Sequence, residues 1–384
     1  MRVLQLLCQL NLDSHCGTPA HVVELSEALT RAGVDVTLVA GRGEDRGRAR
    51  QIDRSGIRLV EFEYEDLASF SASLRKRSAL MRGLTNALEA ALPLVASEPA
   101  PVLHAHDLPH GPWIAEVIDR HARTPFLTTS HGADLEQAVG DAGYQRLLTR
   151  NRYGSHLIGV GPHLQPQLER YAKGSRVGYI PGGVDAQRAA GPTRPERGAR
   201  SGLLYVGRLA PEKGVLELPE IFARVCEELP DKHLTIAGDG PLKELLTQRL
   251  AARGLDQRAR MLGWLPEERV TALMHTAEVL VFPSRWPEPF ARTLLKAAVA
   301  GLPTVTRDLG GNAEILGEGY PGLLPASATS ADLATAVKAT LGSAEKRASA
   351  TESARLRATE RFGWDAIASS YLDLYEECLE GCPS

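Results

Sequence analysis

The sequence predicts an α/β protein made of two doubly wound, Rossmann-like domains that face a central cleft. Short runs rich in Val, Ile and Leu alternate with segments of helical period, which is typical of parallel sheets built from βαβ units. This alternation occurs in residues 1–188 and again in residues 203–361. Between them, residues 189–202 are rich in Gly, Pro and Arg, which indicates an interdomain linker.

The composition is that of a globular protein. The chain has 384 residues, of which 43% are hydrophobic and 24% charged, enough for two cores. The net charge of −3 argues against a general nucleic-acid-binding protein. No apolar run approaches the roughly 20 residues of a membrane span, and polar residues interrupt the first segment as they would not in a signal peptide. The basic run at residues 71–84 leaves peripheral membrane contact open, although such runs are more often solvated helix faces.

Motifs for metal and cofactor chemistry are missing from the sequence. There is no Asp-x-Asp, no His-Glu-x-x-His and no Cys/His cluster, so no metal site or cofactor is predicted. The five cysteines are odd in number and mostly scattered, which indicates reduced thiols and a cytoplasmic protein.

In the first half, seven strands are predicted, at residues 3–8, 34–41, 56–62, 101–106, 125–130, 156–161 and 176–181. Gly17 and Thr18 follow the first strand and precede a helix that begins near Ala20, so their amides could approach a phosphate or an acceptor; equally, Gly17 could serve the turn alone. Histidine-containing loops at residues 104–107 and 130–134 follow two other strands. Because the carboxyl ends of parallel strands lie at one sheet edge, both loops are expected on the ligand-binding side.

In the second half, five strands are predicted, at residues 202–208, 233–240, 258–264, 278–284 and 303–308. The loop after the first of them carries Arg208 and Lys213, two cations that could cradle a diphosphate. The next loop contains Gly238 and Gly240, which either contact a ligand or only permit the turn. Their spacing is not that of the dinucleotide-binding fingerprint.

A helix is predicted over residues 290–300. Pro289 suits its first turn, and Gly301 ends it. Its amino-terminal amides and Arg292 suit an anion. Lys296 interrupts its apolar stripe, and either extends to solvent or contacts a ligand.

The last segment, residues 362–384, is predicted to form an amphipathic helix that packs back on the N-terminal domain. Its apolar residues recur at steps of three and four: Trp364, Ile367, Tyr371, Leu374 and Cys378.

Six segments of the second half, in this order and spacing, resemble the C-terminal domain of retaining glycosyltransferases with the GT-B fold: VGRLAPEKG, IAGDGP, LGWLP, FPSRWPEPF, AGLP and GGNAEIL. In the first half the resemblance is weaker and involves the Gly17 turn and the segments SHGAD and PGGVD. The resemblance implies that the second domain binds a nucleotide-sugar donor and the first a hydroxyl-bearing acceptor, with no obligatory metal. The expected activity is sugar transfer with retention of configuration, of the hexosyltransferase type.

The resemblance also implies roles for single residues. Arg208 and Lys213 would hold the donor diphosphate and stabilise its departure, while Glu288 would contact the sugar hydroxyls. His131 would lie near the sugar, and Asp134 would be an acceptor contact or a structural partner. The positions implied at the base, the phosphates and the sugar are Gly238, Trp264, Leu265, Phe290, Ala291 and Arg292.

Lys296 departs from the pattern of this family, in which a second glutamate follows the first after seven residues and accepts hydrogen bonds from both ribose hydroxyls. Lysine can only donate, and two lost charge-assisted hydrogen bonds of roughly 1.5–3 kcal/mol each would weaken donor binding about a hundredfold or more. Three interpretations are open. Lys296 donates to ribose oxygens or a phosphate in a working transferase; the donor is a deoxythymidine diphosphate sugar or a sugar phosphate, the latter in a phosphorylase-like enzyme; or the protein is a catalytically impaired binding partner. A nucleotide-sugar epimerase of similar fold is less favoured, because the Glu288 segment is similar to that of transferases.

Overall fold

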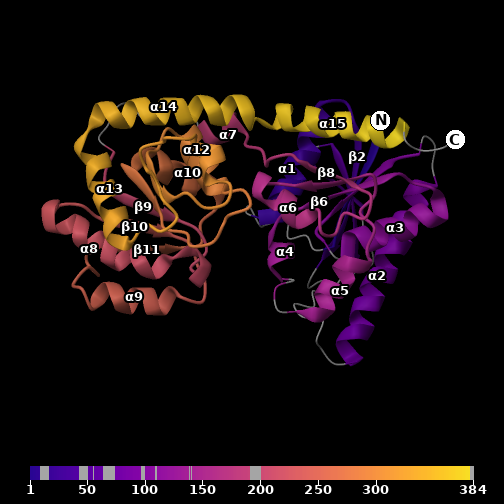
Figure 1. Ribbon diagram of the computed structural model, residues 1–384, viewed down its shortest axis with the longest axis horizontal. Coiled ribbons are helices and arrows are strands. Elements are labelled where there is room, and N and C mark those ends of the chain that lie inside the picture. Colours follow the sequence, from indigo (N-terminus) through magenta and orange to yellow (C-terminus); the bar gives the residue numbers. More distant parts are fainter. Residues whose placement is uncertain are drawn as a thin grey trace. The chain divides into compact units, whose positions relative to one another are not determined.

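The protein forms two compact α/β units in a computed structural model (Figure 1). The first comprises Met1–Gly183 and Trp364–Ser384, and the second Val184–Gly363. Residues 184–188 thus belong to the second unit, whereas the sequence prediction placed them in the first. Residues 191–199 of the predicted linker lie outside the described residues, which are 1–8, 17–42, 51–54, 56–63, 74–96, 100–108, 110–137, 139, 141–190 and 200–380.

The first unit contains an eight-stranded sheet in the order β3-β4-β2-β1-β5-β6-β7-β8. All neighbouring strands are parallel except the antiparallel pair β3 and β4. The seven predicted strands are confirmed, and β3 was not predicted. The strands are β1 (Arg2–Leu7), β2 (Asp35–Arg42), β3 (Gln51–Arg54), β4 (Ile57–Glu63), β5 (Val102–His106), β6 (Phe126–Ser130), β7 (His156–Gly159) and β8 (Arg176–Tyr179).

Helices cover both faces of this sheet, because alternate residues of a strand point to opposite sides. Val3 and Leu7 of β1 pack with α1 and α15, whereas Leu4 and Leu6 pack with α2 and α3. The helices of this unit are α1 (Gly17–Arg31), α2 (Leu74–Val95), α3 (His110–Ala122), α4 (Ala133–Gln137), α5 (Ala142–Arg150), η1 (Pro162–Leu164), α6 (Gln165–Leu168) and α15 (Trp364–Glu380).

The second unit contains a six-stranded parallel sheet in the order β11-β10-β9-β12-β13-β14. The five predicted strands are confirmed, and only the short β14 was missed in this half of the described chain. The strands are β9 (Leu203–Val206), β10 (Leu234–Ala237), β11 (Ala259–Gly263), β12 (Val279–Phe282), β13 (Thr304–Arg307) and β14 (Leu323–Leu324).

The helix predicted over residues 290–300 is α11 (Arg292–Val299), which begins two residues later because Ala291 has non-helical dihedral angles. Helices α11 and α14 pack in one apolar cluster, and α8 and α13 in another. The other helices are α7 (Ala186–Ala190), η2 (Pro211–Lys213), η3 (Val215–Glu217), α8 (Leu218–Glu228), α9 (Lys243–Ala251), α10 (Glu267–Thr276), α12 (Asn312–Leu316), α13 (Ser330–Gly342) and α14 (Ala344–Arg361).

The carboxyl-terminal helix α15 belongs to the first unit, where it lies beside α1 (Figure 1). Its buried face contains Trp364, Ile367, Tyr371 and Cys378 as predicted, but Tyr375 is buried in place of Leu374, which is half-buried. The chain therefore passes from α14 of the second unit to α15 of the first.

Two sequence expectations concern membranes and thiols. Within the described ranges, no helix is long and apolar enough to cross a membrane. The side chains of residues 71–80, most of the basic run, lie outside the described part of the chain. Of the cysteines described, Cys8, Cys226 and Cys378 are in no disulfide, while Cys16 and Cys382 lie outside the described residues.

Candidate active site

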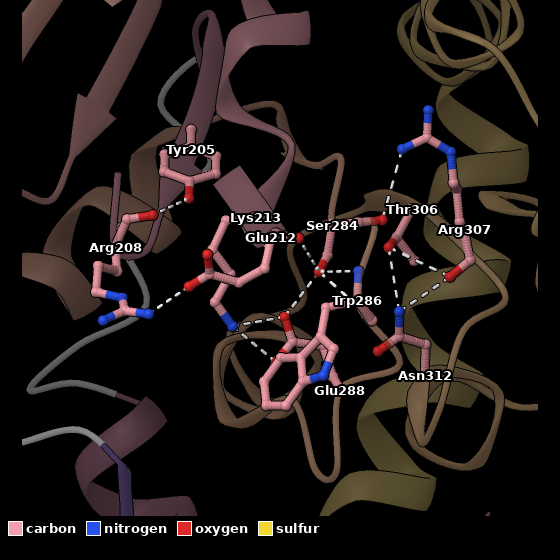
Figure 2. A network of polar contacts seen from close by, with 10 residues as sticks. All are labelled: Tyr205, Arg208, Glu212, Lys213, Ser284, Trp286, Glu288, Thr306, Arg307 and Asn312. Atoms are coloured by element: carbon pink, nitrogen blue, oxygen red, sulfur yellow. Dashed lines mark hydrogen bonds and ion pairs between the residues drawn. The ribbon is translucent and has the colours of Figure 1, made fainter. Parts of the chain in front are cut away.

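The predicted site residues Lys213 and Glu288 form an ion pair in the second unit (Figure 2). Lys213, at the end of η2, places its Nζ 2.6 and 2.8 Å from the two carboxylate oxygens of Glu288, in the segment after β12. Glu288 is only 5% exposed. Ser284 Oγ donates to Glu288 Oε1 at 2.8 Å, and the Trp286 ring centre lies 4.9 Å from Nζ. Two residues 75 positions apart thus form a partly buried pair with a defined orientation.

Two glycines allow the backbone to close around this pair. Gly214 has φ +63°, and a Cβ there would lie 2.1 Å from the carbonyl oxygen of Pro283. Gly310 has φ +61°, and its Cβ would lie 2.3 Å from the carbonyl oxygen of Glu288. The next amide, of Gly311, donates to that same oxygen at 2.9 Å. Any larger residue at either glycine would displace the segments that hold Lys213 and Glu288.

Arg208 lies at the carboxyl end of β9 and pairs with Glu212 (Figure 2). Its side chain is 67% exposed, so the guanidinium is accessible to a ligand. The backbone is fixed because Tyr205 Oη donates to the carbonyl oxygen of Arg208 at 2.9 Å. The two predicted phosphate-binding cations are therefore each paired with a carboxylate of the protein.

Backbone packing explains why position 238 is a glycine, without any contact to a ligand. Its φ is +152°, and a Cβ would lie 1.9 Å from the carbonyl oxygen of Gly207. Gly240 approaches the carbonyl oxygen of Leu209 in the same way, at 2.6 Å from an added Cβ. The loops after β9 and β10 therefore need glycine in order to pack together.

The amino terminus of α11 has no side-chain cap, which is consistent with an anion site. The Phe290 ring packs edge-on against Phe362, with ring centres 5.5 Å apart. Ala291 is buried, and the Arg292 amide donates to the carbonyl oxygen of Phe290 at 2.9 Å. The ring of Phe290 thus packs against the core, which leaves the backbone of this residue for a ligand contact.

A second ion-pair cluster, which the sequence prediction missed, supports the same segment. Arg307 Nη2 lies 2.6 Å from Glu217 Oε2, and Arg285 Nε lies 2.6 Å from Glu217 Oε1. Arg307 also donates to the carbonyl oxygen of Pro283 at 2.8 Å, next to Ser284. Burial opposes ionisation, but hydrogen bonds from Arg285, Arg307 and Ser330 hold the pKa of Glu217 below its ordinary value.

Lys296 is neither solvated nor unpaired. Its Nζ lies 2.5 Å from Oε1 of Glu267, the first residue of α10, and the two side chains are only 15% and 25% exposed. Trp264, three residues before Glu267, is 55% exposed, and Leu265 is half-buried. Lys296 thus pairs with a carboxylate that lies three residues after Trp264, close in sequence to the segment expected to border the nucleotide base. Nothing in the sequence pattern pointed to Glu267, because the contact joins two separate helices.

In the first unit, Asp134 is a structural partner of the loop that carries His131. Its Oδ1 accepts hydrogen bonds from Ser130 Oγ at 2.8 Å and from the amides of Gly132 and Leu135 at 2.9 Å. Its Oδ2 accepts from the amide of Leu108 at 2.9 Å. Burial raises the pKa of Asp134, although these donors oppose the shift.

His131 lies in a cluster of histidines from three elements. Its Nε2 is 3.1 Å from His106 Nδ1, and its ring centre is 4.8 Å from that of His21 in α1. His104 and His106 of β5 are fully buried. Burial and the neighbouring histidines hold the pKa of both far below the ordinary value, so they are neutral near pH 7.

The remaining predictions concern the turn after β1 and metals. Gly17 and Thr18 begin α1, so the helix starts earlier than Ala20, and Gly17 has φ +72°. Residues 9–16 of this turn lie outside the described residues. Among the residues described, no group of three His, Cys, Asp or Glu side chains could hold a metal ion.

Comparison with known proteins identifies the family. Residues 194–357 match the model of group 1 glycosyl transferases, and residues 16–188 match that of glycosyltransferase family 4. Glycogen synthase of Mycobacterium tuberculosis is 30% identical over 397 residues, covering 95% of this chain and 92% of the relative. Phosphatidyl-myo-inositol mannosyltransferase of Mycobacterium leprae is 27% identical over 382 residues, covering 97% and 96%.

Solved structures agree in fold. Sucrose-phosphate synthase from Thermosynechococcus elongatus superposes with a TM-score of 0.77 at 21% identity, covering 98% of this chain and 99% of the other. HepE of Anabaena, in complex with UDP and glucose, gives 0.73 at 19%, covering 98% and 100%. The class is therefore that of glycosyltransferases with the GT-B fold, as the sequence predicted. The chain belongs to the group 1, family 4 glycosyltransferases.

Proposed function

We propose that this glycosyltransferase transfers a hexosyl group from a nucleoside-diphosphate sugar to a hydroxyl acceptor, with retention and without a metal ion. The observation that carries the proposal is the partly buried Lys213–Glu288 pair. A nucleotide sugar offers a diphosphate to a cation and sugar hydroxyls to a carboxylate, and this pair provides both. The structure of HepE with UDP and glucose supports a donor of this class.

Donor binding would exchange the partners of the two cations. Lys213 and Arg208 would turn from Glu288 and Glu212 to the diphosphate, because phosphate oxygens accept several charge-assisted hydrogen bonds. Glu288 would then accept from the sugar hydroxyls while Ser284 still holds one of its oxygens. The uncapped amino terminus of α11, with the amides of Phe290, Ala291 and Arg292, would add positive potential.

The charges that develop as the anomeric bond breaks determine what these residues would stabilise. Cleavage of the anomeric bond leaves an oxocarbenium-like sugar and a diphosphate that gains negative charge, which fixed cations and amides stabilise. The leaving phosphate oxygen would take the acceptor's proton on the same face, which gives retention. The first unit would bind the acceptor, with His131 as its contact to the sugar. Glu288 does not act as a nucleophile in this scheme, because Ser284 holds one of its oxygens and the sugar hydroxyls would donate to the other.

The Lys296–Glu267 pair would bind the ribose of the donor. Glu267 supplies a carboxylate that accepts hydrogen bonds, and Lys296 adds a donor. This pair would replace the second glutamate of the family pattern, with the exposed Trp264 ring beside the base. Among the interpretations of Lys296, we therefore favour a working transferase with a rearranged pocket. A cytoplasmic location is proposed with it, supported by the described cysteines Cys8 and Cys226, which are in no disulfide.

Donor turnover tests the proposal. The protein is incubated with UDP-glucose, ADP-glucose or GDP-mannose, whose sugars are all α-linked, and nucleoside diphosphate release and the anomeric configuration of the product are measured. We expect turnover of at least one donor, an α product, and a loss of about 100- to 1000-fold in kcat for Lys213→Ala. The matched control is Lys243→Ala, which removes a lysine from an exposed ion pair with Asp239 in the same unit. A β product would overturn retention, and equal rates for both variants would overturn the role of Lys213.

A further inference from the structure

A continuous chain of buried hydrogen bonds joins His131 to helix α15 within the first unit. From His131 Nε2 the chain runs to His106 Nδ1 at 3.1 Å, and from His106 Nε2 to Gln5 Oε1 at 2.5 Å. Gln5 Nε2 donates to Tyr375 Oη at 3.2 Å, and Tyr375 Oη lies 2.8 Å from His104 Nδ1.

The chain ends on a second tyrosine of the same helix. His104 Nε2 lies 2.8 Å from Thr129 Oγ1, which lies 3.2 Å from Tyr371 Oη. All six side chains beyond His131 have 0% exposure: Gln5, His104, His106, Thr129, Tyr371 and Tyr375. An apolar core would avoid the cost of burying so many polar groups, so the chain calls for a reason beyond stability.

The orientation of the Gln5 amide gives the bonds their direction, because each link needs one hydrogen. Gln5 donates through its amide nitrogen to Tyr375, so its oxygen accepts from His106 Nε2. A neutral imidazole with a proton on Nε2 has an acceptor at Nδ1, and His106 Nδ1 therefore accepts from His131 Nε2. Since Tyr375 Oη accepts from Gln5, its own hydrogen is left for His104 Nδ1, and a neutral His104 then donates from Nε2 to Thr129.

We propose that His106 is a positioning residue that fixes the ring and tautomer of His131, and that Gln5 and Tyr375 fix the tautomer of His106. His131 then keeps its proton on Nε2 and presents Nδ1 as an acceptor. The kinetic part of the inference rests on the proposed function, in which His131 contacts the transferred sugar. Through Tyr375 the geometry of His131 depends on α15, which follows the second unit in the chain.

The residues around His106 keep its ring neutral. The titratable groups that face it are His21 of α1, His104 of β5 and His131, while Tyr371 and Tyr375 of α15 lie against His104. Burial, with the charges of these histidines, places the pKa of His106 far below its ordinary value. A neutral ring of a single tautomer is what the chain of hydrogen bonds requires.

Nitrogen NMR of the histidine rings tests the proposal without any ligand, because protonated and unprotonated ring nitrogens resonate separately. In protein labelled with ¹⁵N at its 11 histidines, His106 and His131 are assigned from His106→Asn and His131→Ala. We expect both rings to carry the proton on Nε2 in the native protein. A proton on Nδ1 of His106 would overturn the proposal.

Tyr375→Phe tests the dependence on α15. Without the hydroxyl, either end of the Gln5 amide can face His106, so both tautomers of His106 and His131 should appear. The matched control is Tyr153→Phe, another fully buried tyrosine of this unit, whose hydroxyl donates to the carbonyl oxygen of Leu148 at 2.8 Å. If Tyr375→Phe does not fold, Gln5→Met keeps the length of the side chain and breaks the chain between His106 and Tyr375. Native-like tautomers in these chain variants would contradict the proposal.

Kinetics then separate this proposal from the proposed function. With the donor that the native protein turns over, we expect Tyr375→Phe to lower kcat about tenfold with unchanged KM, and Tyr153→Phe to leave both unchanged. The double variant Tyr375→Phe/His131→Ala should be no slower than His131→Ala alone, because Tyr375 acts through His131. Additive losses would overturn the positioning role. Full activity of His131→Ala would instead overturn the assigned function of His131, and the ring spectra would still decide the positioning.

Discussion

The two units place different chemistry at the carboxyl ends of their strands. In the second, the buried polar groups are ions in pairs, Lys213 with Glu288 and Arg307 with Glu217. In the first, they are neutral histidines, His104 and His106, hydrogen-bonded to tyrosine, threonine and glutamine side chains. Both arrangements satisfy their buried groups, but only the ion pairs of the second unit hold charge that a ligand can bind.

The difference matches the roles that we propose, donor binding by the second unit and acceptor binding by the first. A diphosphate needs cations that can change partners, and an ion pair keeps such cations ready while no ligand is bound. A residue that contacts a sugar needs a fixed direction and tautomer, which a neutral hydrogen-bonded chain provides. The two networks should therefore respond differently to substitution and to acidification.

The largest effect is expected from Glu217→Gln in the second unit. Arg307, with a side chain only 3% exposed, would lose its carboxylate, and breaking a buried pair in this way costs about 3–5 kcal/mol in the free energy of unfolding. Urea unfolding followed by hydrogen exchange in peptides of each unit measures the loss. The matched control is Glu220→Gln, from an exposed pair with Arg224, for which we expect less than about 1 kcal/mol. Equal losses of stability in the two variants would contradict a supporting role of the Glu217 ion pairs.

Acidification should destabilise the first unit at a higher pH than the second. Histidines have an ordinary pKa of 6.5, and burial lowers that of His104 and His106 far below it and that of His110 to about 4. Below pH 6.5 the unfolded first unit therefore binds more protons than the folded one, so its stability falls by up to about 1.4 kcal/mol per pH unit for each such histidine.

The second unit should keep its stability to a lower pH than the first. The pKa of Glu217 is lowered from 4.5, so its contribution is complete above pH 4.5 and is lost only as the pH falls through the lower folded value. Hydrogen exchange of each unit between pH 7.5 and 5 measures the contrast. Asp134, whose pKa is raised, acts with the opposite sign in the range where carboxyl groups titrate. Equal loss of protection in both units above pH 5 would contradict the comparison.

A smaller effect is expected at Lys296. In Lys296→Glu two carboxylates would face each other, and we expect UDP, GDP, ADP or dTDP, whichever the native protein binds, to bind about ten- to a hundredfold more weakly. The exchange Lys296→Glu/Glu267→Lys restores the pair and should recover part of the loss. Calorimetry measures both variants. Nucleotide binding that appears only in Lys296→Glu would contradict the working pocket and favour a sugar-phosphate substrate or a binding partner.

The smallest effect is expected from Trp264→Ala. The ring is 55% exposed, so stability should not change, whereas the loss of stacking on the base should weaken nucleotide binding about fivefold. Leu262→Ala, in β11 and 41% exposed, is the matched control. The two variants are compared in the same titration, and unchanged binding in Trp264→Ala would remove the ring from the pocket.

The fold could be predicted from the sequence because parallel strands buried on both faces are continuous apolar runs. The two strands that escaped prediction lack this signal. β3, QIDR, is a polar strand paired on one side only, and β14 has two residues. On α15, the sequence pattern could not decide between a step of three to Leu374 and a step of four to Tyr375.

The site was predictable where charged residues follow the ends of strands. Arg208, Lys213 and Glu288 stood out by charge near strand ends and by family resemblance, and the structure joins two of them directly. Glu267 and Glu217 escaped because each pairs with residues far away in the chain, and nothing local distinguishes them from solvated glutamates. Gly238 stood out for a different reason, since close packing of two loops requires it.

The central claim is that the Lys213–Glu288 site binds a nucleoside diphosphate, and calorimetric titration tests it most directly. UDP, GDP and ADP are titrated into the native protein, Lys213→Ala and the control Lys243→Ala. We predict that at least one nucleotide binds the native protein and Lys243→Ala alike, and binds Lys213→Ala at least about thirtyfold more weakly, as expected for a lost charge-assisted hydrogen bond of about 2 kcal/mol. Equal affinities for all three proteins would contradict the claim.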